Sequence, residues 1–442
     1  MKNYKTFLIS AYLIGLHHFG YAQKKPDLLT SSEKIETTKS VGRIINENYI
    51  FPEVADKIVA LLDGKLKNGE YKAVKDPSEF AEMLTKDIQS FNHDRHLRVL
   101  FEPQRIAEQK KVISAEDRLR LEQDYIEELK RKNYFFKEVK ILEGNIGYID
   151  FRRFRDPIYA AQTAISALNF LSNTEAIIID LRYNGGGSPK MVQLISSYFF
   201  GDEPVHLNSI YKRKNKQDKQ YWTLPYIDGN KNPDAHLYIL TSKMTFSGAE
   251  EFAYNLKHLK RAILIGESTG GGAHPGGRIA ANDKFNVWTP TGRSINPITG
   301  TNWEGVGVIP HIQTSAQEAL LAAHIKALDS LKTESEDLNQ KKYYQWHLQI
   351  LEAKRKPASV ALSTLKTYVG DYGIRNISLE DGSLYYQRKN ATRYKLIPVD
   401  QTTFIMNEFQ DFRVQFSKSN NEVVALLGLN EDGTSTEYKK TK

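Results

Sequence analysis

The sequence contains no cysteine and no apolar run of the roughly 20 residues that a membrane-spanning helix needs. Without cysteine, the chain has neither a disulfide framework nor a thiol that a lipid could modify. Its stability must therefore come from the burial of apolar side chains, which a length of 442 residues permits. That length also predicts about two to four domains rather than a single core.

Blocks of one charge sign are also missing. The 61 Lys and Arg residues and the 53 Asp and Glu residues are mixed along the chain, so the net charge of +8 is diffuse. A nucleic-acid-binding surface would need basic residues gathered in a stripe with aromatic residues between them. The composition, 40% apolar and 26% charged, is typical of a soluble globular protein. We therefore expect no nucleic acid partner and no wholesale disorder.

The first 22 residues have the pattern of an export signal. Lys2 and Lys5 form a positive region, residues 7–16 form a short apolar stretch, and Ala22 ends a small-residue cleavage site. The apolar stretch is too short to span a bilayer, so we expect no integral membrane segment once the signal is removed. The mature chain is predicted to begin at Gln23 and to be periplasmic or extracellular. An uncleaved N-terminal helix is the alternative.

Between about 141 and 315 the sequence alternates buried strands with helices. The strand candidates are residues 145–151, 176–181, 237–240 and 262–266, and the helix candidates begin at Pro189 and Ser247. Such alternation predicts an α/β fold with a largely parallel sheet that helices bury. In sheets of this kind, sites form where loops leave the carboxyl ends of the strands.

The regions on either side have different patterns. Residues 31–100 are predicted to be helical, with one helix starting at Asp76-Pro77. After about residue 360 the apolar period becomes two, and Asp381-Gly382 and Asp432-Gly433 mark hairpins. The predicted units are a signal peptide (1–22), a helical N-terminal domain (23–110), a charged helical connector (111–140), an α/β core (141–315), a helical connector (316–357) and an antiparallel β domain (358–442).

One glycine-rich loop, Asn184 to Gly187, follows the strand at 176–181. It is not a P-loop, because no G-K-[ST] follows, and it fails the dinucleotide pattern because Lys190 stands where the third glycine belongs. Three glycines can expose backbone N–H groups, as an oxyanion hole or a phosphate cradle requires. A tight turn between a strand and a helix is the alternative without a function.

Ser247 opens a helix as Ser247-Gly248-Ala249-Glu250. The pattern S-x-x-E is a capping box, and a cap alone would explain this serine. Its position favours chemistry as well, because it follows a buried strand by a short loop and stands at a helix N-terminus. Backbone N–H groups and the helix dipole there favour a developing negative charge.

Several segments together resemble the family of the tail-specific (C-terminal processing) peptidases, the tricorn protease core and interphotoreceptor retinoid-binding protein. The segments are HDRHLRV (93–99), GNIGYIDFRRF (144–154), IIIDLRYNGGG (177–187), TSKMTFSGAEEFAYNLK (241–257), GESTGGGAHPGG (266–277) and NWEGVGVIP (302–310). A further segment, NYIFPEVADKI (48–58), resembles the helical N-terminal domain of the retinoid-binding branch. The resemblance implies a core akin to the ClpP and crotonase enzymes, with Ser247 as the nucleophile.

The resemblance also implies a catalytic set. One branch of the family uses a lysine about 25 residues after the serine, but no lysine lies between Lys260 and Lys284 here. The tricorn-like branch uses an upstream histidine and a downstream glutamate, and His96 and Glu304 match these positions. The implied oxyanion donors are the N–H of Gly248 and one from Gly185 or Gly186. His274 is a rival base or, with Gly271 and Gly272, a substrate contact.

Some features depart from that pattern or allow other roles. Arg95 stands where the tricorn-like branch has a serine, and His311 where the family commonly has an aspartate. His93 and His96 are spaced like metal ligands, but no third ligand lies nearby, so we expect no metal and no cofactor. Glu304 can equally be an exposed loop acid. About 40 residues separate His96 from the strand at 145–151, too few for a PDZ domain.

The predicted function is therefore that of an exported serine peptidase, which hydrolyses a peptide or protein substrate through a Ser-His-Glu acyl-enzyme mechanism. Ester hydrolysis would use the same residues. The alternative from another class is a non-catalytic carrier that binds an apolar ligand or a peptide on the same fold.

Overall fold

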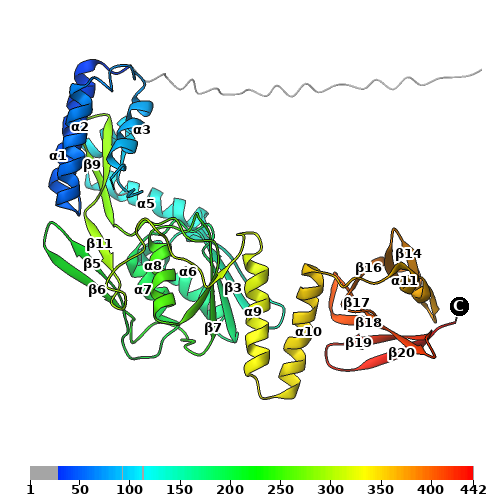
Figure 1. Cartoon of the computed structure of the whole chain (residues 1–442). Coiled ribbons are helices and arrows are strands. Elements are labelled where there is room, and N and C mark those ends of the chain that lie inside the picture. Colours follow the sequence, from blue (N-terminus) through cyan, green and yellow to red (C-terminus); the bar gives the residue numbers. More distant parts are fainter. Residues whose placement is uncertain (1–27, 92, 112–113, 442) are drawn as a thin grey trace, which may run out of the picture.

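The computed structural model describes residues 28–441 except 92, 112 and 113, so the predicted signal at 1–22 lies outside the described residues. Figure 1 shows an N-terminal helical unit, a central α/β unit and a C-terminal β unit arranged one after another. Helices α9 and α10 lie between the central unit and the C-terminal sheet. Among the described residues, no helix combines the length and apolarity that crossing a membrane requires.

The N-terminal unit consists of α1 (Ser31–Asn48), α2 (Pro52–Lys67) and α3 (Pro77–Ile88). The predicted start of α3 is confirmed: the Asp76 carboxylate accepts the N–H groups of Ser78 and Glu79 at 2.8 and 3.0 Å. A small antiparallel sheet packs against these helices in the order β1 (Arg98–Phe101), β10 (Phe285–Pro290), β9 (Gly276–Ala280). Buried Phe285 and Val287 of β10 belong to the same core as the helices. This sheet therefore joins a late segment of the chain to the first unit and holds residues 93–97 beside residues 270–276.

The central sheet has the order β12-β8-β7-β4-β3-β2, and every neighbouring pair is parallel except β2 and β3. Its strands are β2 (Phe136–Leu142), β3 (Ile146–Phe151), β4 (Ala176–Asp180), β7 (His236–Thr241), β8 (Ala262–Gly266) and β12 (Ile312–Gln313). Alternate residues of β4 enter two cores, with Ile177 and Ile179 on one face and Ile178 on the other. The predicted fold class, an α/β core with a largely parallel sheet, is confirmed.

Helices cover both faces of this sheet. One face is buried by α6 (Pro157–Phe170), α7 (Pro189–Ser197) and α8 (Gly248–His258), and the other by α9 (Ala319–Glu334). The remaining helical pieces before the sheet are α4 (Pro103–Lys110), α5 (Ala115–Arg131) and the short 3-10 helix η1 (Asn133–Phe135). A second antiparallel sheet, in the order β11-β5-β6, consists of β5 (His206–Lys212), β6 (Gln217–Trp222) and β11 (Gly292–Ile295). No local pattern in the sequence predicted this sheet.

The C-terminal unit begins after α10 (Leu338–Arg355) with the short helix α11 (Leu362–Tyr368). Its eight strands form one antiparallel sheet in chain order: β13 (Gly370–Tyr372), β14 (Arg375–Glu380), β15 (Ser383–Arg388), β16 (Arg393–Pro398), β17 (Thr403–Met406), β18 (Phe409–Ser419), β19 (Glu422–Asn430) and β20 (Ser435–Lys439). Both predicted hairpin turns, at Asp381-Gly382 and Asp432-Gly433, connect neighbouring strands. Helix α10 packs on this sheet, where its Ile350 and Ala353 share a small core with Ile405 of β17.

Candidate active site

Ser247 lies in the turn that joins β7 to α8, at the carboxyl edge of the central sheet. Its backbone has φ 55° and ψ −123°, a conformation that a residue with a side chain adopts only at a cost of roughly 1–3 kcal/mol. An ordinary N-cap has extended dihedrals, so a capping role alone does not account for this backbone. The residue is partly exposed, and the turn therefore presents a serine to solvent directly at a helix N-terminus.

The glycine-rich loop after β4 lies directly against the serine turn. A Cβ atom on Gly186 would come within 2.9 Å of Ser247 Cβ, and one on Gly187 would come within 2.0 Å of the Phe154 carbonyl oxygen. Glycine at these two positions is thus what permits the close approach. Asn184 fixes the loop, because its side chain donates to the Phe151 carbonyl at 2.8 Å and its own carbonyl accepts the Phe246 N–H at 3.1 Å.

The N–H groups of this loop are used differently from the prediction. Gly185 donates its N–H to the Arg152 carbonyl at 3.3 Å, and Gly186 donates to the Asn184 side chain at 2.8 Å. Neither is therefore free to bind an oxyanion. Within the described part of the chain, the N–H groups of Gly187 and Gly248 have no hydrogen-bond acceptor, and a Cβ on Gly248 would lie 2.9 Å from the Gly187 nitrogen. Gly248 was predicted as such a donor, whereas Gly187 offers a free N–H where Gly185 or Gly186 was predicted.

His96 lies beside the serine turn, just before β1. Its ring contacts that of Phe246, the residue before Ser247, with centroids 4.6 Å apart, and it stacks on Trp288 at 4.9 Å. The ring is buried, and its Nδ1 has no partner among the residues that the structure describes. Burial lowers the pKa of His96 to about 4, while the nearby Asp94 carboxylate acts in the opposite direction. The imidazole is therefore neutral at neutral pH, as a proton acceptor must be.

His274 lies between two carboxylates. Its Nδ1 is 2.9 Å from Asp94 Oδ2 and 3.3 Å from Glu304 Oε2. The Tyr49 hydroxyl donates to the same Asp94 oxygen at 3.0 Å, and the other Asp94 oxygen accepts the backbone N–H of His96 at 3.0 Å. Asp94 and His274 are both buried. Asp94 therefore connects the two histidines, a role that the sequence analysis missed although the residue stands inside the motif HDRHLRV.

Glu304 contacts His274 and not His96. Its Oε2 also accepts the N–H of Ala273 at 2.5 Å, so the carboxylate is fixed in the loop that carries His274. Burial raises the pKa of Glu304 to about 7, and the negative charge of Asp94 adds to this rise. The direct pairing of Glu304 with His96 that the resemblance implied is not present in this structure. The interpretation of Glu304 as an exposed loop acid also fails, since its side chain is only 13% exposed.

Glu250 connects the serine turn to the loop of residues 269–272. Its carboxylate accepts the N–H of Ser247 at 2.8 Å, as the capping-box pattern predicts. It also accepts the N–H groups of Gly271 and Gly272 at 2.6 and 2.9 Å, and the hydroxyl of Thr269 at 2.5 Å. Burial raises the pKa of Glu250 to about 7, although these hydrogen bonds act to lower it. Gly271 and Gly272 are thereby fixed to the residue that also holds the Ser247 N–H, and Gly272 lies against the rings of Phe246 and His96.

One group of three side chains has the spacing of a metal site. The ligand atoms of Asp94, His274 and Glu304 all lie within 4.8 Å of one another. The hydrogen bonds of this cluster already hold the imidazole between the carboxylates, so its geometry does not require a metal ion. His93 is exposed and does not join His96 in any such group among the described residues.

The two departures from the family pattern have different positions. Arg95 is exposed, lies over the Phe246 ring at 5.3 Å and donates to the Gly270 carbonyl at 2.7 Å. It therefore borders the site without contacting a carboxylate. His311 accepts the Leu264 N–H through Nδ1 at 2.9 Å and supports the end of the sheet instead.

Two family models match this chain. Residues 145–314 match peptidase family S41, and residues 24–135 match the N-terminal domain of that peptidase family in eukaryotic interphotoreceptor retinoid-binding protein. The first range includes Ser247, His274 and Glu304, and the second includes His96. The resemblance to the tail-specific peptidases that the sequence motifs indicated is thus confirmed.

Individual relatives match only a short part of this chain or have low sequence identity to it. A tail-specific protease of Haemophilus influenzae is 31% identical over 98 residues, which is 22% of this chain and only 13% of that protein. Among solved structures, a lipoprotein from Streptococcus agalactiae has a TM-score of 0.46 at 14% identity, covering 67% of this chain and 96% of that one. The tricorn protease has a TM-score of 0.42 at 14% identity, covering 66% of this chain and 35% of that one.

Proposed function

We propose that this chain, which matches peptidase family S41 over residues 145–314, is a serine peptidase that hydrolyses peptide bonds through an acyl-enzyme intermediate. The observation that carries the proposal is the turn at Ser247. A partly exposed serine with φ 55° stands at a helix N-terminus, and the unoccupied N–H groups of Gly248 and Gly187 lie next to it. A serine hydroxyl beside two converging N–H donors is the arrangement that acyl transfer requires.

In this proposal His96 is the general base. A hydroxyl is a weak nucleophile near neutral pH and needs a neutral acceptor for its proton. His96 is neutral there, its ring contacts the residue before Ser247, and Trp288 and Phe246 fix the orientation of that ring. His274 has no comparable contact with the serine turn among the described residues, and its Nδ1 is already engaged by Asp94.

Glu304 is proposed to act on His96 indirectly. When His96 takes the proton from Ser247, it becomes a buried cation, which the nearby Asp94 carboxylate stabilises. Glu304 and His274 border that carboxylate, so an ionised Glu304 adds negative charge to the same cluster. A carboxyl group whose pKa is about 7 can ionise near neutral pH, where that charge is useful.

The proposed reaction then follows from the geometry. Ser247 Oγ attacks the scissile carbonyl while His96 accepts its proton, and the N–H groups of Gly187 and Gly248 bind the oxyanion. His96 returns the proton to the leaving amine, and a water molecule hydrolyses the ester in a second, equivalent cycle. Gly271 and Gly272, held by Glu250, are proposed to line the substrate together with His274. No step uses a cofactor.

The cellular setting is part of the proposal. The export-signal pattern of residues 1–22 and the match to a tail-specific protease support a peptidase that acts in the periplasm or outside the cell. N-terminal sequencing of the exported form should find Gln23 as the first residue. A cytosolic chain that retains Met1 would contradict this localisation.

Peptide hydrolysis itself is tested with a library of internally quenched peptides. The wild-type chain should cleave members of the library, and Ser247→Ala should abolish cleavage while the unfolding temperature stays near that of the wild type. If the wild type binds library peptides without cleaving any, the chain is a carrier on this fold, and the peptidase proposal is wrong.

A further inference from the structure

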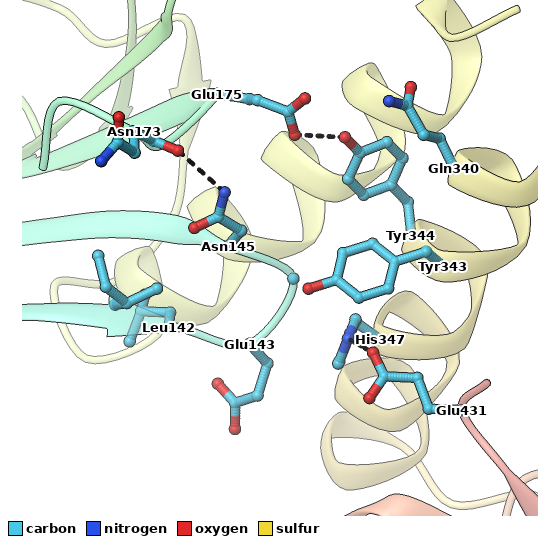
Figure 2. A pocket seen from close by; sticks show the side chains of 12 residues that line it. Leu142, Glu143, Asn145, Asn173, Glu175, Gln340, Tyr343, Tyr344, His347 and Glu431 are labelled. Atoms are coloured by element: carbon cyan, nitrogen blue, oxygen red, sulfur yellow. Dashed lines mark hydrogen bonds and ion pairs between the residues drawn. The ribbon is translucent and has the colours of Figure 1, made fainter. Parts of the chain in front are cut away.

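A pocket lies at the amino edge of the central sheet, opposite the edge that carries Ser247. It has a volume of about 640 Å³ and lies between the catalytic unit, helix α10 and the β19–β20 turn of the C-terminal sheet (Figure 2). The lining side chains used below are Glu143, Glu175, Tyr343, Tyr344, His347 and Glu431. A volume of this size is within the range of pockets that bind small ligands or side chains.

The polar lining of this pocket is acidic. Three of its residues are glutamates, and none is Lys or Arg, although the whole chain carries a net charge of +8. Each glutamate bonds a group other than Lys or Arg: Glu143 accepts from the Gln410 amide at 2.5 Å, Glu175 accepts from the Tyr344 hydroxyl, and Glu431 bonds His347 at 2.8 Å. Among the described residues, no Lys or Arg forms an ion pair with any of the three. The pocket therefore gathers three carboxylates, none of which pairs directly with a Lys or Arg in the described part of the chain.

His347 provides an independent sign of a missing donor. Its side chain is only 6% exposed, and Nε2 is 2.8 Å from Glu431 Oε1. An ionised carboxylate only accepts hydrogen bonds, so Nε2 must carry a proton, which leaves the lone pair of a neutral imidazole on Nδ1. That Nδ1 is buried and has no partner in the described part of the chain. A buried acceptor without a donor is costly, and a ligand that donates hydrogen bonds would relieve this cost.

Aromatic rings complete the pocket. Figure 2 shows Tyr343 between Tyr344 and His347 on the face of α10 that borders the pocket, opposite Glu143 and Asn145. The Tyr343 ring lies 4.7 Å from that of His347 and 5.6 Å from that of Tyr344. Tyrosine rings attract organic cations through their faces, and the carboxylates attract the same charge. Carboxylates, aromatic rings and an unoccupied acceptor all favour one ligand chemistry, a hydrogen-bond-donating organic cation.

We infer that this pocket binds a Lys or Arg side chain of a polypeptide, as a substrate-holding site remote from Ser247. The cationic chemistry follows from the pocket alone, whereas the choice of a polypeptide as its source rests on the proposed peptidase function. Strand β4 shows how the two sites are related, because Glu175 directly precedes it and the loop with Gly187 follows it. A polypeptide held here would be retained during repeated encounters with the active site, and its effective concentration there would rise.

The binding test uses the full Ser247→Ala chain, so that no probe is cut. A fluorescent Gly/Ser peptide containing lysines is titrated at low salt and followed by anisotropy, together with the same peptide with acetylated lysines and with free 1,5-diaminopentane. The lysine peptide should bind more tightly than both other probes. Glu143→Gln with Glu175→Gln should weaken its binding by about tenfold, because two attractive charges are lost while glutamine can still accept the hydrogen bonds of Gln410 and Tyr344.

A matched control separates the pocket from net charge. Glu127→Gln with Glu128→Gln removes the same charge from the exposed surface of α5 and should leave the affinity within about twofold. Equal weakening by both double variants, or equally tight binding of the acetylated peptide, would overturn the site. Tighter binding of the free diamine would overturn the assignment to a polypeptide. Because these titrations require no catalysis, a failure of the peptidase proposal is detected separately, in the cleavage assay.

Discussion

The two edges of the central sheet carry opposite polar groups. At the carboxyl edge, Ser247 is flanked by the unoccupied N–H donors of Gly187 and Gly248, which suit an anion. At the amino edge, Glu143, Glu175 and Glu431 surround a pocket that suits a cation. A single strand, β4, connects the two edges. In a parallel sheet, the loops that leave the strands gather at the carboxyl edge and the loops that enter the strands gather at the amino edge. One sheet can therefore support two sites of opposite charge.

Burial also differs between the two edges. The carboxylates near the serine, such as Glu250 and Glu251, are buried, and burial raises the pKa of each to about 7. The carboxylates of the other pocket are partly or fully exposed. The carboxylates of the carboxyl edge therefore lie in a desolvated environment, which strengthens electrostatic effects on chemistry, whereas those of the amino edge are open to reversible binding.

The largest effect is expected from substitutions of the proposed catalytic residues at the carboxyl edge. His96→Ala and Ser247→Ala should each lower kcat on a peptide reporter by about 10⁴ or more, and the double variant should be scarcely slower than either single one, because the two residues act as one unit. His274→Ala should act mainly on KM. The amino-edge variant with Glu143→Gln and Glu175→Gln should leave kcat on a short neutral reporter unchanged. A near-normal His96→Ala together with an inactive His274→Ala would identify His274 as the base.

A smaller effect should follow from moving one oxyanion donor. Gly248 is helical, so alanine suits its backbone, but the new Cβ would lie 2.9 Å from the Gly187 nitrogen. Gly248→Ala should therefore separate the two N–H groups and lower kcat by about 10²–10³. Gly277→Ala in β9, where a Cβ meets no neighbour within 4 Å, is the matched control. Unchanged kcat in Gly248→Ala, measured beside a thermal melt, would exclude this pair as the oxyanion site.

Glu304→Gln should change the pH profile. The pKa of Glu304 is about 7, so kcat/KM of the wild type should fall as the pH is lowered through 7 and this group becomes protonated. It should fall a second time near pH 4, where His96 becomes protonated. In Glu304→Gln the step near pH 7 should disappear, because the group that titrates there is gone. Above pH 8, kcat/KM should be roughly tenfold lower, because the loss of one nearby negative charge destabilises protonated His96 by about one pKa unit, which corresponds to a factor of ten. A profile identical to that of the wild type would show that the charge of Glu304 does not reach the base.

The smallest effect concerns stability. Burial raises the pKa of Glu251 from 4.5 to about 7, so the folded state keeps a proton that the unfolded state loses between these values. The free energy of unfolding should therefore fall as pH rises from 4.5 to 7. Glu251→Gln should lessen that fall, by on the order of 1–3 kcal/mol, in urea titrations at pH 5 and pH 7.5. Glu250 and Glu304 should maintain part of the slope. A slope equal to that of the wild type would mean that Glu251 is charged in the folded state.

Local patterns made much of the fold predictable. Strands β3, β4, β7 and β8 are short apolar runs between turn residues, and the helix caps at Asp76 and Ser247 depend on neighbours within three positions. Such signals are contained in a few consecutive residues, so the sequence alone reveals them. The sheet of β5, β6 and β11 is different, because β11 pairs with β5 across about 80 residues, and no local pattern specifies that pairing.

The candidate site, like the fold, could be predicted from local patterns only in part. Ser247, His96 and Glu304 were predicted from motifs, but motifs do not say which side chains touch. The contact of Glu304 with His274, and the position of Asp94 between the histidines, depend on how β1 and β10 pair. The N–H of Gly187 is likewise free because of tertiary contacts. The neighbouring carbonyls of Arg152 and Phe154 accept the N–H groups of Gly185 and Ser188 instead. These are facts of tertiary packing, which only the folded structure provides.

The central claim is that Ser247 is an activated nucleophile, and covalent labelling tests it most directly. The mature protein is incubated with a fluorophosphonate probe, digested, and the labelled residue is identified by mass spectrometry. We expect a single label on Ser247, much slower labelling in His96→Ala, and none in Ser247→Ala. A label on another residue, or a wild-type chain that remains unlabelled while it cleaves peptides, would contradict the claim.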